Sequence, residues 1–228
     1  MAQRSMKVEV FDTKERATAN NDVAAKQLRD SLNQEKTFLV NVMSSPGSGK
    51  TTTLVRTINA LKDRYKIGVL EADVDSDVDA KTIADTGAKV IQLHTGGACH
   101  MDADMTRRGL EKMGYEGLDL VFLENVGNLV CPAEFDIGAN MSLMILSVPE
   151  GDDKPLKYPL MFTVSDVVLI NKIDVCPIFD FDFDACSKRV SKLNPKHKMI
   201  PLSSKTGENF EEWIDTLVNA IEDWRETL

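Results

Sequence analysis

The sequence lacks long hydrophobic runs and long basic runs. No apolar stretch approaches the ~20 residues that a membrane-spanning helix needs, and the N-terminal residues lack the apolar core of a secretory signal. Among its 228 residues, 27 are Lys or Arg and 36 are Asp or Glu, so the formal net charge is −9 at pH 7. Proteins that bind nucleic acids need clusters of basic side chains. We therefore expect a cytoplasmic protein with neither a membrane nor a nucleic acid as its partner.

Cysteine is also scarce. The four cysteines are Cys99, Cys131, Cys176 and Cys186, and no two of them form a Cys-x-x-Cys pair. Structural disulfides are rare in the cytoplasm, so we expect buried thiols or metal ligands. The hydrophobic fraction of 43% and the charged fraction of 28% are typical of a globular protein. The length suits a single domain over residues 1–228. Within it, residues 1–36 are expected to form an N-terminal segment and a helix that packs on the rest of the domain.

Segments typical of strands and helices alternate along the chain. Residues 1–12 are expected to be extended and peripheral, and residues 13–36 and 209–227 to form amphipathic helices. On the first helix, the expected inner stripe is Ala17, Val23, Ala24, Leu28 and Leu32. The expected strands are 38–42, 66–73, 89–94, 118–125, 141–151, 164–174 and 197–203. This alternation predicts an α/β three-layer sandwich, with a mostly parallel sheet of about seven strands. Ligands then bind beyond the carboxyl ends of the strands.

The segment 38–53, FLVNVMSSPGSGKTTT, joins an apolar strand to a helix through a glycine-rich turn. This context indicates a phosphate-binding loop. Glycines let successive backbone N–H groups converge on a phosphate, and the helix N-terminus adds a positive dipole end. Lys50 is expected to reach the β- and γ-phosphates, and the Thr51 hydroxyl to ligate Mg²⁺. The expected nucleotide contacts of this loop are Gly47, Ser48, Gly49, Lys50, Thr51 and Thr52.

Ser44 occupies the position where the usual phosphate-loop pattern has its first glycine. A serine fits there only if the backbone avoids a strongly positive φ. Pro46 stiffens the same loop. The alternative interpretation of the whole stretch is a Gly-Ser linker, which the flanking strand and helix make unfavourable.

The tetrad Asn171-Lys172-Ile173-Asp174 closes another apolar strand. A carboxylate at Asp174 can accept hydrogen bonds from both N1–H and the exocyclic N2–H of guanine, and adenine lacks these donors. Asn171 would fix the loop and the base, and the stem of Lys172 would cover the purine. Alone, the tetrad is only moderately specific, because a surface turn after a buried strand can look the same.

The tripeptide Ser203-Ser204-Lys205 follows the last expected strand. A backbone N–H near Ser204 or Lys205 would donate to guanine O6, although the tripeptide by itself is also compatible with an ordinary turn. Because it lies in the right order after the phosphate loop and the tetrad, the three motifs together favour GTP over ATP.

Acidic residues follow two of the strands. Of the four aspartates at positions 73, 75, 77 and 79, we expect Asp73, and next Asp77, to hold Mg²⁺ or to orient the attacking water, and at least two to be solvated. Glu124 would face the Mg²⁺ shell, and the Gly127 N–H would sense the γ-phosphate, whose loss releases the loop. The alternative is that Glu124 is a buried glutamate capping a turn. The expected catalytic residues are Lys50, Asp73 and Glu124.

Cys99 and His100 are adjacent, and Cys131 follows the Glu124–Gly127 loop. Thiolates and an imidazole suit Zn²⁺ and also Ni²⁺. Three ligands leave a tetrahedral site incomplete, and a second copy of the chain across a two-fold axis could complete it. The alternative is two inert thiols and a polar histidine. Cys176 and Cys186 are interpreted as incidental.

Several stretches together resemble the HypB family of hydrogenase nickel-incorporation GTPases: SSPGSGKTT, EADVDSDVDA, GGACH, ENVGNLVCP, SVPEGDDKPLKYP, NKID and PLSSKTGE. The resemblance covers roughly residues 15–225. It implies a P-loop GTPase fold of the SIMIBI type, slow hydrolysis of GTP to GDP, and a homodimer that forms with GTP. It also implies that Cys99, His100 and Cys131 bind zinc or nickel at the dimer interface. The implied partners are the small nickel protein HypA and the hydrogenase large-subunit precursor.

The resemblance therefore implies a GTP-hydrolysing metallochaperone that delivers nickel during maturation of nickel–iron hydrogenase. Some members of the family carry a cysteine-rich motif or a histidine-rich tract near the N-terminus, and this sequence shows neither. Nickel storage is therefore not expected. Three alternatives remain: nickel delivery to another enzyme such as urease, a metal-binding scaffold with weak GTPase activity, and a small ATP-dependent kinase. The NKID tetrad speaks against the kinase.

Overall fold

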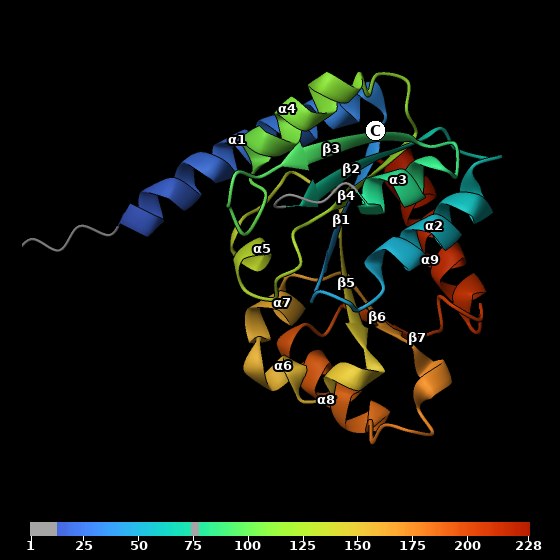
Figure 1. The fold of residues 1–228 in the computed structure, drawn as a ribbon. Coiled ribbons are helices and arrows are strands. Elements are labelled where there is room, and N and C mark those ends of the chain that lie inside the picture. The colour runs from blue at the N-terminus through green and yellow to red at the C-terminus, as the bar shows by residue number, and fades with distance from the viewer. Residues whose placement is uncertain (1–12, 74–77) are drawn as a thin grey trace, which may run out of the picture.

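A computed structural model of the chain describes residues 13–73 and 78–228, and the side chains of the first helix from residue 19 onward (Figure 1). The expectations for residues 1–12, for the side chain of Ala17 and for Asp77 therefore lie outside the described residues.

In the described part of the chain, seven strands form one sheet in which every neighbouring pair is parallel. The strand order is β3-β2-β4-β1-β5-β6-β7. The strands are β1 (Phe38–Ser44), β2 (Ile67–Asp73), β3 (Lys89–His94), β4 (Leu120–Glu124), β5 (Met141–Ser147), β6 (Val167–Asn171) and β7 (Lys198–Pro201). The predicted α/β fold with a parallel sheet of about seven strands is confirmed. Because β1 lies at the centre, the loop that follows it leaves from the middle of the carboxyl edge.

Helices cover both faces of the sheet (Figure 1). They are α1 (Thr13–Glu35), α2 (Lys50–Leu61), α3 (Val78–Ala84), α4 (Ala103–Met113), α5 (Cys131–Glu134), α6 (Lys154–Lys157), α7 (Pro159–Thr163), α8 (Phe183–Leu193) and α9 (Phe210–Glu226). Two short 3-10 helices, η1 (Val148–Glu150) and η2 (Ile173–Val175), follow β5 and β6.

The core on the α2 and α9 face is continuous. Ile58 of α2 and Trp213 and Leu217 of α9 are fully buried against β1 and its neighbours. The indole N–H of Trp213 donates to the hydroxyl of Thr57 over 2.9 Å, so the buried polar atom has a partner. Full burial of a side chain such as Leu contributes about 1.5–3 kcal/mol, which makes this face a rigid support for the loop that begins α2.

The opposite face has two separate apolar clusters. One gathers Leu28 of α1 and Leu110 of α4 over β2 and β4, and the other gathers Phe162 of α7 and Val190 of α8 over β5 and β6. The four-residue helix α5 lies beside the central strand between them, where its residues line one cavity with Asn41 and Met43 of β1. A short helix cannot fill that width, so a cavity remains beside α5.

The predicted N-terminal helix is present as α1, but part of its expected inner stripe is wrong. Val23 is 60% exposed, Ala24 is half-buried, and Ala25 is fully buried with Leu28 and Leu32. Residues three and four apart share one helix face, and the face that packs on the sheet runs through Ala25 rather than Val23.

Two strands are shorter than the sequence predicts. β5 ends at Ser147, because Glu150 in η1 accepts hydrogen bonds from the Ser147 backbone N–H (2.8 Å) and hydroxyl (2.7 Å). β6 ends at Asn171, because Lys172 has a left-handed φ of 65° that ends an extended strand. Helices α6, α7 and α8 were not predicted, although prolines at the first turns of α6 and α7 are a helix-start signal.

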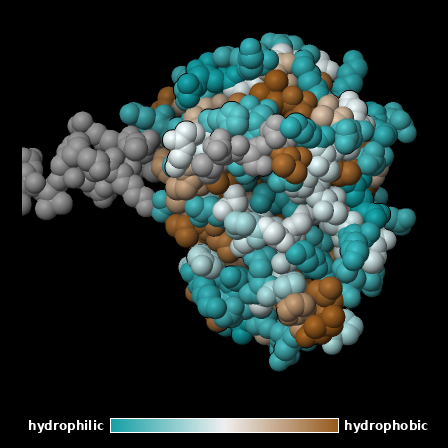
Figure 2. Space-filling model, in the orientation of Figure 1, coloured by the Kyte–Doolittle hydropathy of each residue, from teal (hydrophilic) through white to brown (hydrophobic). Residues whose placement is uncertain are grey.

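Figure 2 shows a mostly hydrophilic face on which hydrophobic residues form separate patches. Among the residues that the structure describes, no helix combines the length and the apolar character needed to cross a membrane.

Candidate nucleotide and metal sites

The loop after β1 has the backbone that a phosphate-binding loop requires. Gly47 and Gly49 have φ values of 75° and 101°, a region that side-chain-bearing residues rarely adopt. Ser44 does not have a positive φ, so its side chain is tolerated at the first position of the pattern. The Ser44 hydroxyl accepts hydrogen bonds from the Lys50 ammonium (3.1 Å) and the Ser48 hydroxyl (2.7 Å). This serine therefore holds the lysine at the start of the loop.

A cavity of about 380 Å³ opens over this loop. It is lined by Gly47, Gly49, Lys50, Thr51, Thr52, Asp79, Glu124 and Lys172. The Thr51 hydroxyl donates to Oε1 of Glu124 over 3.3 Å, and Oε2 of Glu124 is buried with no hydrogen-bond partner among the described residues. Burial raises the pKa of Glu124 to about 7, and the positive charge of Lys50 partly offsets this effect. An orphaned carboxylate oxygen beside a hydroxyl fits Mg²⁺, which prefers oxygen ligands.

The aspartates after β2 differ in position. Asp73 ends β2, half-buried, and its negative charge contributes to raising the pKa of Glu124. Asp79 lines the cavity from the first turn of α3. Among the four aspartates the sequence favours Asp73 and next Asp77, and it does not single out Asp79. All four residues are aspartates, so residue type alone does not show that Asp79 is the one that lies in the first turn of a helix.

A second cavity, of about 310 Å³, adjoins the phosphate loop. It is lined by Gly49, Thr52, Asn171, Lys172, Asp174, Val175, Ser204 and Lys205. The side chain of Asn171 donates to the carbonyl of Ser48 and accepts from the backbone N–H of Ser204, both over 2.9 Å. The Lys172 ammonium donates to the carbonyl of Gly47 over 2.6 Å. The tetrad and the 203–205 tripeptide are thus bonded to the phosphate loop and to each other.

Close packing in this cavity explains why residue 49 is a glycine. A Cβ atom on Gly49 would lie 2.4 Å from the amide nitrogen of Asn171, so only glycine fits. The Ser203 hydroxyl donates to Oδ1 of Asp174 over 2.6 Å, which orients the carboxylate. Arg56 of α2, which sequence reasoning missed, donates to the carbonyl of Ser204 over 2.8 Å. No sequence pattern indicates this role of Arg56, because its partner is a backbone oxygen on a distant loop.

The loop after β4 packs against the phosphate loop. A Cβ atom on Gly127 would lie 3.0–3.3 Å from atoms of Pro46, so the absence of a side chain allows the close approach. The next residue, Asn128, donates its backbone N–H to the carbonyl of Ser44 over 2.9 Å. The two loops are therefore joined by a hydrogen bond and by close packing.

Cys99, His100 and Cys131 come together in space from two different loops. Their candidate ligand atoms all lie within 4.8 Å of one another. The pKa of the Cys99 thiol is raised, first by its hydrogen bond with Cys131 and then by burial. In contrast, burial raises the pKa of Cys186 to about 12, and neither it nor Cys176 belongs to a cluster of this kind among the described residues.

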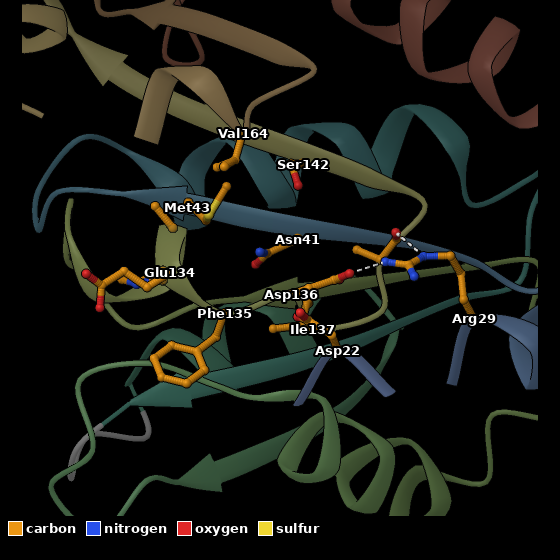
Figure 3. A pocket seen from close by; sticks show the side chains of 13 residues that line it. Asp22, Arg29, Asn41, Met43, Glu134, Phe135, Asp136, Ile137, Ser142 and Val164 are labelled. Carbon is orange, nitrogen blue, oxygen red and sulfur yellow. Dashed lines mark hydrogen bonds and ion pairs between the residues drawn. The ribbon is translucent and has the colours of Figure 1, made fainter. Parts of the chain in front are cut away.

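The imidazole of His100 stacks on the ring of Phe135, with centroids 4.0 Å apart and an interplanar angle of 12°. Phe135 in turn lines the cavity beside α5, which measures about 370 Å³ (Figure 3). Asn41 of the central strand lies at its middle, and Arg29 of α1 pairs with Asp136 over 2.5 Å at its rim. Its described lining includes none of the predicted nucleotide or metal ligands, and it adjoins the metal cluster through Phe135.

Comparisons with known proteins show which family the chain is similar to. A family model described as the CobW/HypB/UreG nucleotide-binding domain matches residues 38–201. The hydrogenase maturation factor HypB of Rhizobium leguminosarum bv. viciae is 45% identical over 193 residues, which cover 85% of this chain and 64% of the relative. The hydrogenase/urease maturation factor HypB of Helicobacter pylori is 38% identical over 208 residues, which cover 90% of this chain and 85% of the relative.

A solved structure is also similar. The crystal structure of HypB from Helicobacter pylori in complex with nickel matches with a TM-score of 0.83 at 38% identity, over 90% of this chain and 96% of that chain. The chain spans slightly less than two thirds of the length of the Rhizobium relative.

Proposed function

The chain belongs to the CobW/HypB/UreG family of nucleotide-binding proteins, and from that premise we propose that it is a GTP-hydrolysing nickel metallochaperone. Its client would be the precursor of the large subunit of a nickel–iron hydrogenase. The observation that carries the proposal is the segment 124–131, which runs from Glu124, in the cavity over the phosphate loop, to Cys131 of the Cys/His cluster. Two sites joined by so short a segment are suited to mutual control.

Guanine specificity is supported by the cavity beside the phosphate loop. Asp174 lines it, and its carboxylate is oriented by Ser203. A carboxylate left without its two donors would be costly, so the site would discriminate against adenine. The backbone at Ser204 or Lys205 would donate to guanine O6.

Hydrolysis would depend on positioning and electrostatics around the phosphates. Lys50 would neutralise the β- and γ-phosphates, and Asp73 or Glu124 would orient the attacking water. Mg²⁺ held by Thr51, Asp73, Asp77 and Glu124 would supply further charge neutralisation. Gly127 would sense the γ-phosphate through its backbone N–H, so that loss of phosphate releases the loop.

The cargo site would be shared between two copies of the chain. Cys99, His100 and Cys131 offer three ligands, which is one fewer than a tetrahedral site needs, and Cys99 is exposed. Val130, directly before Cys131, is 49% exposed and would be covered by a second protomer. We propose that GTP favours this homodimer and that Ni²⁺ is the cargo, with Zn²⁺ as the competing ion. A HypA-like protein would exchange nickel with the site.

A second candidate client is urease. The relative from Helicobacter pylori is named as a maturation factor for both hydrogenase and urease. The residues described above would bind the cargo and not the client, so both clients are compatible with the same site. Pull-down of the client from a cell that makes both enzymes separates these candidates.

Phosphate release tests the proposal, measured with GTP and with ATP for the wild type, Lys50→Ala and the control Lys62→Ala, whose lysine lies exposed at the end of α2. We expect release from GTP only, and a loss of roughly 100-fold or more in Lys50→Ala, as for removal of a key electrostatic group. Light scattering with GDP and with a non-hydrolysable GTP analogue, with and without Ni²⁺, tests the dimer. Equal turnover of ATP, or one unchanging mass in all four conditions, would contradict the proposal.

A further inference from the structure

Asn128 lies between the phosphate loop and the two metal-site cysteines and bonds to all three. Its backbone N–H donates to the carbonyl of Ser44 over 2.9 Å. Its side-chain Oδ1 accepts from the backbone N–H groups of Val130 (2.7 Å) and Cys131 (3.2 Å). Its Nδ2 donates to the carbonyl of Cys99 over 3.5 Å. One residue, through its backbone and its side chain, therefore connects segments that are far apart in the sequence.

The connection begins at the part of the phosphate loop that holds Lys50. Ser44 is fully buried, and its hydroxyl accepts the hydrogen bond from the Lys50 ammonium. When Lys50 moves to a γ-phosphate, this bond has to change, and Asn128 is bonded to the same serine through its backbone. The backbone at Gly127 lies so close to Pro46 that the two loops pack directly on each other.

The connection ends at two bonds of unequal strength. The bond from Cys131 N–H to Oδ1 has an ordinary length, whereas the bond from Nδ2 to the Cys99 carbonyl lies at the outer limit for a hydrogen bond. A small displacement of Asn128 would break or shorten the second bond first. That change alters the separation of the two thiols, because Cys99 and Cys131 are carried by different loops.

A parallel link exists at Asn125, but it reaches neither cysteine. Its Oδ1 accepts from the backbone N–H of Met101 over 3.2 Å, and its Nδ2 donates to Asn41 of the central strand over 3.1 Å. Asn125 is fully buried and bonded to the sheet, so it serves as a fixed anchor. Asn128 is half-buried, and its bonds join the last residue of β1, the start of α5 and the loop that carries Cys99.

We propose that Asn128 is the positioning residue that transmits the state of the phosphate loop to the metal-site thiols. It contacts neither the phosphates nor the metal in this role, and acts through Ser44 on one side and through Cys99 and Cys131 on the other. This role rests on the proposed coupling of nucleotide binding to metal binding, and it assigns the transmission between the two sites to Asn128.

The experiment measures how fast iodoacetamide alkylates Cys99 and Cys131 in the metal-free full-length chain. Each cysteine is quantified by peptide mass spectrometry, with GDP and with a non-hydrolysable GTP analogue. The variants are Asn128→Ala and Asn128→Asp. The control is Asn140→Ala. The side chain of Asn140 accepts a hydrogen bond from the backbone N–H of Leu39 over 2.8 Å near the start of β1, so this substitution removes the same kind of bond elsewhere in the fold. Nucleotide affinity and circular dichroism establish that each variant is folded.

For the wild type and Asn140→Ala, we expect the alkylation rates with the two nucleotides to differ by roughly 5-fold or more, the lower end of ordinary coupling between sites. In Asn128→Ala the ratio should approach one for both cysteines. Asn128→Asp keeps the acceptor and loses the donor, so the response of Cys131 should persist and that of Cys99 should disappear.

Titration of Ni²⁺ in the same four proteins gives a second measurement. The ratio of the nickel dissociation constants with the two nucleotides should collapse in Asn128→Ala while nickel binding itself persists. An unchanged ratio in Asn128→Ala, in either measurement, overturns the role of Asn128 alone. A wild-type ratio of one overturns both this inference and the coupling in the proposed function, whereas GTP hydrolysis and metal binding would stand as measured separately.

Discussion

Glu71 and Glu124 are direct neighbours across the parallel pair β2 and β4, so two buried carboxyl groups lie side by side beneath the phosphate cavity. Each is 2% exposed. Burial raises the pKa of Glu71 to about 8, with the negative charge of Glu124 as the next cause, and burial likewise raises the pKa of Glu124 to about 7. The sheet therefore favours the protonated form of both carboxyl groups close to the place where the nucleotide's cation is expected to bind.

This pair predicts that the free protein loses stability as the pH rises. Both pKa values lie above the ordinary value of 4.5, so between that value and about 7 or 8 the folded state binds more protons than the unfolded state. The free energy of unfolding then falls with increasing pH, by up to about 1.4 kcal/mol per pH unit for each proton involved. Glu71→Gln should flatten this slope. Urea unfolding across this pH range, without nucleotide and Mg²⁺, measures it. Glu116→Gln, an exposed substitution, is the control, and an equal slope in both variants would contradict the prediction.

Asp174→Asn should weaken GTP binding by about tenfold or more and should strengthen binding of xanthosine triphosphate. The asparagine amide can no longer accept both guanine donors, and a hydrogen bond to a charged group contributes about 1.5–3 kcal/mol. Isothermal titration with both nucleotides is the measurement. Ser203→Ala, which removes only the 2.6 Å bond that orients the carboxylate, should have a smaller effect. GTP affinity equal to that of the wild type would show that Asp174 does not read the base.

Cys131→Ala should abolish stoichiometric binding of Ni²⁺ or Zn²⁺, because it removes one of the three ligand atoms that lie within 4.8 Å of one another. Metal stoichiometry is measured by equilibrium dialysis and elemental analysis. Cys176→Ala is the matched control, because this half-buried thiol lies in the loop after β6, away from the cluster. Full metal occupancy in Cys131→Ala would place the site elsewhere.

Phe135→Leu should weaken Ni²⁺ binding by a few fold, while Phe135→Tyr should retain it. The ring of Phe135 holds the imidazole of His100 in a parallel stack, and an aromatic pair contributes about 0.5–1.5 kcal/mol beyond its buried area. Leucine keeps apolar volume but loses the stack, so the imidazole becomes free to rotate away. Competition with a chromogenic chelator gives the affinities. If leucine and tyrosine behaved alike, the stack would have no part in orienting the ligand.

Local sequence patterns predicted most of the fold. Apolar runs placed all seven strands, and a turn rich in glycine between a strand and a helix predicted the phosphate loop. The errors lie where packing decides which side chain is buried or where one backbone angle decides where a strand ends. Val23 was expected on the inner face of α1 and is exposed. Lys172 was expected within a strand, but its left-handed φ ends β6. Helices α6 and α7, with four and five residues, have too little periodicity to be recognised from spacing.

The sequence by itself determined which residues could cradle a phosphate, read a guanine and bind a soft metal, because residue type and order along the strands suffice for these chemistries. Only the tertiary structure decided how the sites are connected. The side-by-side carboxyls of Glu71 and Glu124 depend on strand register, and the contacts of Asn128 with Ser44, Cys99 and Cys131 depend on three loops meeting at one edge. Register and loop packing are long-range properties, set by the burial of the whole sheet, and no short stretch of sequence contains them.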